Sequence, residues 1–509
     1  MTVVTTTVGK IKGTQENQLK VFRGIPFAAP PVGDLRWQAP QPHPGWDGVR
    51  DASKFGAEAP QDSSMLDWLM GQADTPPEQT EDCLFLNIWT PATAGKRPVM
   101  FWIHGGGFTM GSGSQPIYDG QHLADRGDVV VVTINYRMGA LGFLNLKALT
   151  GGKIPATGNE GLLDQVAALE WTRDNISVFG GDPANITIFG ESAGGMSVGC
   201  LMAMPAAKGL FHKAIPQSGA CHSANSPEKG LQVAELALEL LGTFDPSALL
   251  ALPVSAFSEL QVNFAKAAVG KNLPGMGAFR PNVDGTVLPE MPINLVRKGS
   301  AAGVAVMTGT CREEWRLFAV IDPARVNMNE QQLQAEVAAF FPDTADKVIA
   351  KYREWLHSRH KASLPVDVLA AFMTDQVFRI PALRLLEAQS EHAMTYSYLF
   401  DWPSPLMAGV VGACHAVELG FNWGTYDKNG SAGFFVEGRE ADLLSARTMD
   451  AWLSFAREGV PSSSGLPEWP VYSRDVPATM RLSTEPSLLL DPDHEINELW
   501  ADDPVIGSM

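Results

Sequence analysis

Residues 186–194 read Ile186-Thr-Ile-Phe-Gly-Glu-Ser-Ala-Gly194, and the apolar run Met196-Ser-Val-Gly-Cys-Leu-Met202 comes close behind. The β-branched and aromatic residues from Ile186 to Phe189 predict a buried strand, and the later run is compatible with a helix. A Gly-x-Ser-x-Gly turn between a strand and a helix exposes the serine hydroxyl above a sheet, because glycine permits the sharp turn. The stretch therefore predicts Ser192 as a nucleophile. The alternative is a glycine-rich turn whose serine only caps the helix.

Other short apolar runs of the same kind surround this stretch. Strands are predicted at Val99 to Ile103, Val129 to Ile134, Val304 to Thr308 and Tyr396 to Phe400. Their nearly continuous apolar character suits strands that are buried on both faces. Residues Gly161 to Asn175, which precede Ile186, have helical spacing and predict a crossover helix. This alternation predicts an α/β fold with a large, mostly parallel central sheet flanked by helices.

The organisation of the chain predicts one continuous domain over residues 1–509, because neither a repeat nor a low-complexity linker divides it. Residues 226–297 and 329–389 are mainly helical in pattern and carry few strand signals. We therefore expect two helical insertions that form the roof of a pocket. The apolar stretch Met65-Leu-Asp-Trp-Leu-Met70 is a further candidate for the pocket wall.

Charge and composition exclude several classes of partner. A formal net charge of -18 repels phosphate backbones and anionic lipid surfaces, so we expect neither a nucleic-acid nor a membrane partner. The sequence contains no apolar run of the roughly 18 residues that a membrane span needs. The five cysteines are an odd number without a Cys-x-x-Cys pair, which argues against a disulfide framework and a zinc site. These features predict a soluble, cytoplasmic protein.

A second functional signal is the run His104-Gly105-Gly106-Gly107-Phe108, which follows the predicted strand Val99 to Ile103 directly. Glycines at such a place let backbone N–H groups approach a substrate oxygen that becomes negative during acyl transfer. Gly106 and Gly107, with Ala193 after the serine, are the candidate donors of an oxyanion hole. The run alone is also compatible with a flexible turn, but beside the serine turn it favours acyl transfer.

The chain resembles the type-B carboxylesterases, a family that includes bacterial p-nitrobenzyl esterases, mammalian carboxylesterases and cholinesterases. The resemblance extends over nearly the whole chain, and its matching stretches occur in the family's order. They are Val21-Phe-Arg-Gly-Ile-Pro-Phe-Ala-Ala-Pro-Pro31, Glu81-Asp-Cys-Leu-Phe-Leu-Asn-Ile-Trp89, Gly105-Gly-Gly-Phe108, Asn135-Tyr-Arg137, Phe179-Gly-Gly-Asp-Pro183, Phe189-Gly-Glu-Ser-Ala-Gly-Gly195, Gln217-Ser-Gly219 and Trp469-Pro-Val-Tyr472. The resemblance implies the α/β-hydrolase fold and a serine carboxylesterase with a Ser-His-Glu triad.

A nucleophilic serine needs a base, and in this fold the histidine comes last in the chain order. His415 lies in Gly412-Ala-Cys-His-Ala-Val-Glu-Leu419, on a predicted loop after the strand Tyr396 to Phe400, and this segment matches the family's catalytic-histidine motif. The alternative for His415 is a structural loop histidine. Among the other late histidines, His357 and His360 fall in a charged helical stretch, where we expect solvated side chains. His392 closes a predicted helix, and His494 lies in an acidic stretch.

The orienting acid is expected after the strand Val304 to Thr308. There the sequence reads Gly309-Thr-Cys-Arg-Glu-Glu-Trp315, where the family reads like Gly-Thr-x-x-Asp-Glu-Gly. Position by position, the resemblance implies Glu314 as the acid. Glu313 replaces the family's aspartate, so two adjacent carboxylates are candidates; we favour Glu314 and expect Glu313 to be a solvated first-turn residue.

These roles define an esterase mechanism. His415 takes the proton of Ser192, Ser192 attacks the carbonyl of a small-molecule ester, and Glu314 stabilises the histidine. We expect no metal and no organic cofactor, and the oligomeric state stays open. Alternatives are an inactive ligand-binding or adhesion relative of the same fold, and a lipase or amidase with the same triad.

Departures from the family's pattern bear on compartment and pocket. Many relatives bridge the cysteine equivalent to Cys83 to an upstream cysteine, but here Ala59 stands at that place, which suits a reducing compartment. Cholinesterases place a Pro-Trp pair after their Gln-Ser-Gly, whereas this chain continues Ala220-Cys-His-Ser-Ala-Asn-Ser226. We therefore expect a wider or more polar acyl side.

Overall fold

The computed structural model describes residues 2–62, 78–269, 271, 273, 277–427, 433–435 and 437–501. Thirteen strands pair in the order β1-β2-β3-β5-β7-β6-β8-β9-β10-β11-β12-β13, with β4 beside β2. The strands are β1 Thr2–Thr6, β2 Gly9–Glu16, β3 Leu19–Pro26, β4 Val49–Asp51, β5 Phe85–Thr90, β6 Arg97–Ile103, β7 Val130–Ile134, β8 Gly181–Glu191, β9 Lys213–Gln217, β10 Ala305–Cys311, β11 Thr395–Phe400, β12 Ala478–Leu482 and β13 Ser487–Leu490.

The middle of this sheet is parallel. The strands from β7 through β6, β8, β9, β10 and β11 to β12 pair in parallel, whereas β5 and β13 pair antiparallel at the two sides. The prediction of an α/β fold with a mostly parallel sheet is confirmed. All five predicted strands are present, and β8 begins earlier, at Gly181, than the apolar run alone indicated.

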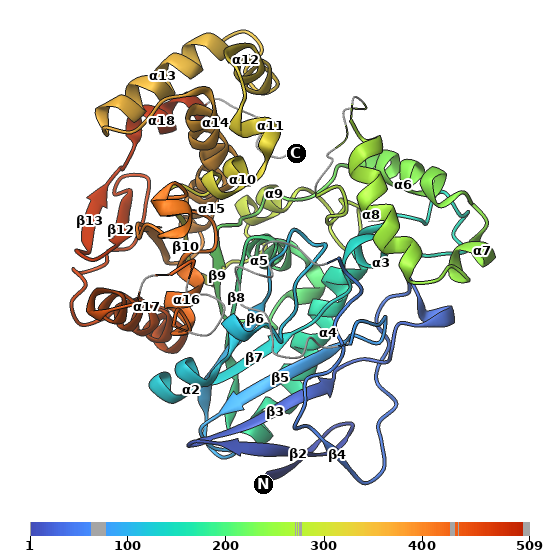
Figure 1. The fold of residues 1–509 in the computed structure, drawn as a ribbon. Helices are drawn as coiled ribbons and strands as arrows, with labels where there is room; N and C mark the ends of the chain where they lie inside the picture. Colours follow the sequence, from blue (N-terminus) through green and yellow to red (C-terminus); the bar gives the residue numbers. More distant parts are fainter. Residues whose placement is uncertain are drawn as a thin grey trace.

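Helices cover both faces of the sheet (Figure 1). They are α2 Gln121–Gly127, α3 Gly139–Phe143, α4 Glu160–Asn175, α5 Ala193–Ala203, α6 Pro227–Leu241, α7 Pro246–Leu250, α8 Ser255–Ala267, α9 Pro292–Arg297, α10 Arg316–Ile321, α11 Pro323–Val326, α12 Glu330–Ala338, α13 Ala345–Ser358, α14 Pro365–Thr374, α15 Ile380–Ser390, α16 Glu418–Trp423, α17 Arg439–Glu458 and α18 His494–Asn497. The predicted crossover helix is α4. Between α14 and α15, Asp375–Arg379 forms a π-helical turn.

The core divides between the two faces because side chains alternate along each strand. On β6, Val99 and Phe101 belong to a cluster with α4, α5 and α15, whereas Met100 and Trp102 belong to a second cluster with α2 and α17. This burial on both faces explains why the central strands read as continuous apolar runs.

The two expected insertions are helical in the structure. Residues 226–297 contain α6 to α9, and residues 329–389 contain α12 to α14, the π-helical turn and most of α15. Figure 1 shows α6, α7 and α8 together on one side of the molecule and α12 to α14 on another. A separate hydrophobic cluster holds the second insertion together and includes Leu333, Tyr352 and Phe372.

Candidate active site

Ser192 lies at the turn between β8 and α5, where the sequence predicted it. Its backbone has a φ of 56° and a ψ of -125°, a conformation that L-residues rarely adopt. Its N–H donates to the carbonyl of Gln217 at 2.9 Å, and its carbonyl accepts from the N–H of Met196 at 2.8 Å. These bonds hold the strained turn between β9 and the first turn of α5.

The glycines around Ser192 are required by close approaches. A Cβ on Gly190 would lie 2.6 Å from the carbonyl carbon of Gly194, and a Cβ on Gly194 would lie 2.0 Å from the carbonyl oxygen of Ile103. No side chain fits at such distances. The Gly-x-Ser-x-Gly pattern is therefore explained by the packing of the turn against the end of β6.

The glycine run after β6 lies beside this turn. A Cβ built on Gly105 would lie 3.2 Å from the Cβ of Ser192, and Gly106 and Gly107 have φ values of 102° and 62°. The loop is fixed because the carbonyl of Gly106 accepts from the N–H groups of Thr109 and Met110, each at 3.1 Å. Among the hydrogen bonds of the described residues, none is donated by the N–H of Gly106, Gly107 or Ala193.

His415 lies on the loop after β11 and reaches both other parts of the site. Its Nδ1 is 2.6 Å from Oε2 of Glu314, and its Nε2 is 3.1 Å from Oε1 of Glu191, the residue that precedes Ser192. The rings of Phe318 and Phe378 pack on the imidazole at centroid distances of 5.1 and 4.8 Å. The structure thus brings the imidazole to Glu314 and to the turn that carries Ser192.

Glu314 and Glu313 point in different directions. Glu314 is completely buried, and its second carboxylate oxygen accepts from the Cys311 N–H at 2.6 Å and from the Ser218 hydroxyl at 2.5 Å. Glu313 instead accepts from the N–H of Ala413 at 3.1 Å and pairs with the Lys361 ammonium at 3.2 Å. Glu314 thus contacts the imidazole of His415, whereas Glu313 contacts Ala413 and Lys361.

Two further carboxylates surround the imidazole, and the sequence reasoning gave neither a role. Glu418 is buried on α16; its Oε2 accepts from the Cys311 thiol at 2.8 Å, and its Oε1 accepts from the Ser218 hydroxyl at 3.5 Å. Glu191 is equally enclosed beside His415. The available signals were the middle position of the Gly-x-Ser turn and the fourth residue of His415-Ala-Val-Glu418.

Burial and crowding shift the pKa values of this cluster. Burial raises the pKa of Glu191 to about 8; the imidazole of His415 opposes that rise, and Glu418 and Glu314 add to it. Burial also raises the pKa of Glu418, with a further rise from the neighbouring Glu314 charge. For His415, burial lowers the pKa, but Glu191 and Glu314 outweigh it and the net shift is upward. Crowded carboxylates cannot ionise independently, so Glu191, Glu418 and His415 influence one another's pKa values.

The other late histidines lie away from this site. His357 and His360 are exposed, and the side chain of His494 is 60% exposed between Asp491 and Glu498. His392 is half-buried just after α15, with its Nε2 at 3.0 Å from the carbonyl oxygen of Arg297. Among the described residues, no group of three or more His, Cys, Asp or Glu side chains could hold a metal ion.

The remaining expectations concern the pocket wall, the cysteines and membrane segments. Residues 65–70 lie outside the described residues. Cys83 is a free, buried thiol, and Ala59, at the place of the family's second cysteine, is buried. Within the described ranges, the structure has no helix long and apolar enough to cross a membrane.

The fold and this arrangement of serine, histidine and carboxylates define a class of serine hydrolases. The chain belongs to the carboxylesterase family, whose model matches residues 1–498. It is a carboxylic-ester hydrolase, and the prediction of a serine carboxylesterase with the α/β-hydrolase fold is confirmed.

Particular relatives cover almost the whole chain. The para-nitrobenzyl esterase of Bacillus subtilis (strain 168) is 40% identical over 494 residues, which are 97% of each chain. The phenmedipham hydrolase of Pseudarthrobacter oxydans is 36% identical and is matched over 94% of each chain. A solved carboxylesterase from Geobacillus stearothermophilus superposes with a TM-score of 0.87 at 38% identity, covering 98% of this chain and 100% of its own.

Proposed function

We propose that the chain hydrolyses small carboxylic esters with Ser192 as nucleophile, His415 as general base and Glu314 as the orienting acid. The observation that carries the proposal is the position of His415: one ring nitrogen lies 2.6 Å from Glu314, and the other lies 3.1 Å from Glu191, the residue that precedes Ser192 in the chain. An imidazole held in this way accepts the serine proton while the carboxylate stabilises the imidazolium.

The reaction then follows from the chemistry of the groups. Ser192 Oγ attacks the ester carbonyl as His415 takes its proton, and the imidazolium returns that proton to the departing alcohol. Water, activated by the same imidazole, attacks the acyl-serine and releases the acid. The N–H groups of Gly106, Gly107 and Ala193 are the proposed donors to the negative oxygen. The proposal is supported by the finding that, among the described residues, none of these N–H groups donates a hydrogen bond.

The substrate class is a small-molecule ester, including aryl and benzyl esters. This part of the proposal is supported by the para-nitrobenzyl esterase of Bacillus subtilis, whose similarity extends over 97% of this chain. A lipase would differ by favouring emulsified long-chain esters, and an amidase by cleaving anilides. An inactive ligand-binding relative would cleave none of these.

Adjacent glutamates provide a matched test. With p-nitrophenyl butyrate, we expect a burst of p-nitrophenol from the native enzyme and its loss in Ser192→Ala. Glu314→Gln is expected to lower kcat by about 10⁴-fold, because the imidazole loses the partner that fixes its tautomer. Glu313→Gln, one residue away, is expected to retain activity within a few-fold. Equal losses in the two glutamine variants would contradict the assigned acid.

We also propose a cytoplasmic location. Its support is that all five cysteines are free and buried, including Cys83, whose place in many relatives belongs to a disulfide. Free thiols in this number suit a reducing compartment. Fractionation of the natural host with an antibody to the chain would test it.

A further inference from the structure

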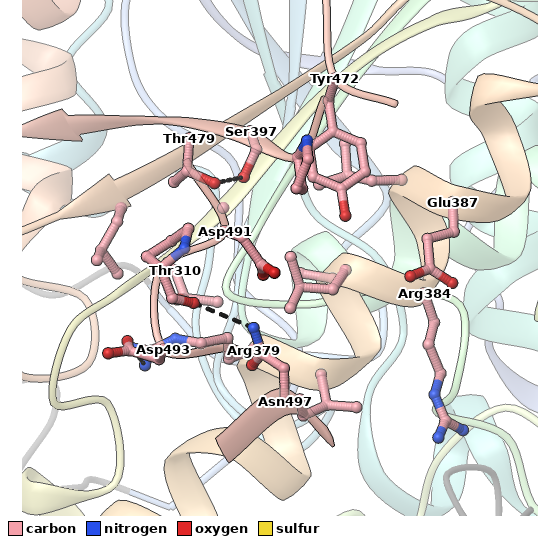
Figure 2. A pocket seen from close by; sticks show the side chains of 18 of the residues that line it. Thr310, Arg379, Arg384, Glu387, Ser397, Tyr472, Thr479, Asp491, Asp493 and Asn497 are labelled. Carbon is pink, nitrogen blue, oxygen red and sulfur yellow. Dashed lines mark hydrogen bonds and ion pairs between the residues drawn. The ribbon is translucent and has the colours of Figure 1, made fainter. Parts of the chain in front are cut away.

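A cavity of about 470 Å³, separate from the proposed active site, lies against the C-terminal part of the sheet (Figure 2). Strands β10, β11 and β12 form its floor, α15 forms one wall, and residues Asp491 to Ala501 form another. Its volume falls within the range of small-molecule sites, roughly 300 to 1,000 Å³. The proposed mechanism uses no residue that lines it.

The cavity and the active-site cluster lie on opposite faces of β10. Thr308 and Thr310 line the cavity, whereas Met307 and Cys311 belong to the hydrophobic cluster on the other face. The thiol of Cys311 donates to Glu418 of the active-site cluster. Because side chains alternate along a strand, one strand separates the two sites.

The floor of the cavity is made of hydroxyl groups. Thr308, Ser397 and Thr479 are direct neighbours across three adjacent strands, and the hydroxyls of Ser397 and Thr479 are 3.0 Å apart. Thr310 lies near them in Figure 2. A sheet face that is covered by a helix is normally apolar, since buried polar groups cost free energy without partners. Hydroxyls both donate and accept, so this floor matches a ligand that does both.

Two arginines of the cavity lining pair with carboxylates. Arg379 pairs with Asp493 at 3.2 Å, and Arg474 pairs with Glu387 at 3.2 Å. The remaining acid at the cavity centre, Asp491, lies 2.6 Å from the imidazole of His494. The lining holds three arginines, Arg379, Arg384 and Arg474, against four carboxylates, Glu387, Asp491, Asp493 and Glu498. It therefore has no excess of positive charge to attract a phosphate or a carboxylate, and the cavity favours an uncharged ligand.

Hydrogen-bonding groups of both kinds converge on this space. Figure 2 shows the Tyr472 hydroxyl, the Asp491 carboxylate and the Glu387 carboxylate pointing toward its middle. Tyr472 is only 4% exposed; burial raises the pKa of its hydroxyl, and Glu387 and Asp491 raise it further, so the hydroxyl stays a neutral donor. In the described structure, the enclosed Oδ1 of Asn497 and Nε of Arg379 make no hydrogen bond.

We propose that this cavity binds a neutral polyhydroxylated molecule, of the class of mono- and disaccharides. Neighbouring hydroxyls on a sugar ring donate to carboxylates such as Asp491 and accept from Tyr472, and the hydroxyl floor satisfies the others. The proposal is independent of the ester substrate.

A ligand bound in the cavity is expected to affect the active site through Arg379. Its guanidinium donates to the carbonyl of Arg312 at 2.9 Å, two residues before Glu314. Phe378, the preceding residue, packs on the imidazole of His415. A sugar that contacts Arg379 is therefore expected to change kcat for p-nitrophenyl butyrate by up to about threefold.

The test is isothermal titration of the full chain with maltose and glucose, and with inorganic phosphate as the anionic probe. We expect saturable binding of at least one sugar and none of phosphate. Thermal shift is unsuitable, because sugars stabilise proteins by exclusion from the surface. Asp491→Asn is expected to weaken sugar binding about tenfold, and Thr479→Val about threefold, because each removes one hydrogen-bonding function.

Asp47→Asn, an exposed residue far from the cavity residues in the chain, is the matched control and is expected to bind the sugar as the native protein does. Circular dichroism of each variant separates loss of binding from loss of fold. Absence of saturable sugar binding, tighter binding of phosphate, or equal affinity in all folded variants would overturn the proposal. Failure of ester hydrolysis would leave it untouched, since the titration needs no turnover.

Discussion

Glu191 is the residue whose ionisation most directly affects the proposed base. Its carboxylate lies 3.1 Å from Nε2 of His415 and shares the enclosed space with Glu314 and Glu418. When it is ionised, its negative charge stabilises the protonated imidazole, and a protonated imidazole cannot accept the proton of Ser192. Removing this charge would weaken the hold of the imidazole on its proton.

Glu191→Gln should therefore shift the pH dependence of kcat/KM. Removing the negative charge removes one of the causes that raise the pKa of His415, so the neutral imidazole persists to lower pH. We expect the acid limb of the profile to move to lower pH. A pH series with p-nitrophenyl butyrate measures it; an acid limb that stays or moves upward would contradict the coupling of these two groups.

Gly106→Ala tests the proposed oxyanion hole. The added Cβ would lie 2.1 Å from the carbonyl oxygen of Met110, at a φ of 102°, so the loop must shift. We expect kcat to fall by about 10²- to 10³-fold, with KM nearly unchanged. Gly152→Ala, at a φ of 79° with open space around it, is the control and should keep its kcat. Comparable kcat losses in both variants would argue against the hole.

Sequence reasoning reached the main residues but not their surroundings. Ser192, His415 and Glu314, the proposed triad, stand in motifs or after predicted strands, so pattern and chain order were enough to select them as candidates. The roles of Glu191, Ser218 and Glu418 follow from side chains that meet only in three dimensions, from the ends of β8 and β9 and from α16. Nothing in their local sequence shows whether such a side chain is buried beside other polar groups or exposed to solvent.

Among the secondary-structure elements, β7 and α4 are joined by a buried ion pair just beyond the end of β7. The Arg137 guanidinium lies 2.7 Å from Oδ1 of Asp164, and its Nε and backbone N–H donate to Oδ2 at 2.8 and 3.0 Å. Both side chains are almost fully enclosed. Such a pair costs much to break, because one charge is then left buried without a partner.

Asp164→Ala is expected to destabilise the protein by about 3 to 5 kcal/mol. Asp174→Ala on the same helix breaks the exposed pair with Arg173, whose side chains are 45% and 49% exposed, and should cost under about 1 kcal/mol. Urea denaturation followed by circular dichroism compares them. Similar midpoints for the two variants would refute the importance of the buried pair.

The central strands were predictable because strands that are buried on both faces consist of continuous apolar residues. The outer strands were not predicted: β1 Thr2–Thr6 and β13 Ser487–Leu490 alternate between buried or half-buried and exposed residues over a few positions. The π-helical turn Asp375–Arg379 was also missed, since it continues the helical pattern of α14 into α15. Its hydrogen bonding depends on packing, which a periodic pattern does not record.

In the molecule as a whole, the five cysteines are free and buried, and they lie far apart in the sequence. Burial raises the pKa of the Cys200 thiol to about 12, and it raises that of Cys83 as well, so neither is a ready nucleophile. We expect the native protein to react slowly with Ellman's reagent and to show five thiols after unfolding in guanidinium. A rapid native reaction, or fewer than five thiols in the freshly unfolded protein, would contradict this arrangement.

Strand β10 has a consequence for how the enzyme can diversify. Cys311 contacts Glu418 on one face of this strand, and Thr308 and Thr310 line the hydroxyl-rich cavity on the other, so the two compartments are separated there by a single strand. A one-residue insertion would exchange their linings completely. A change in β10 that alters the lining of one site therefore also affects the other site. We expect substitutions on the two faces of β10 to occur together among related enzymes.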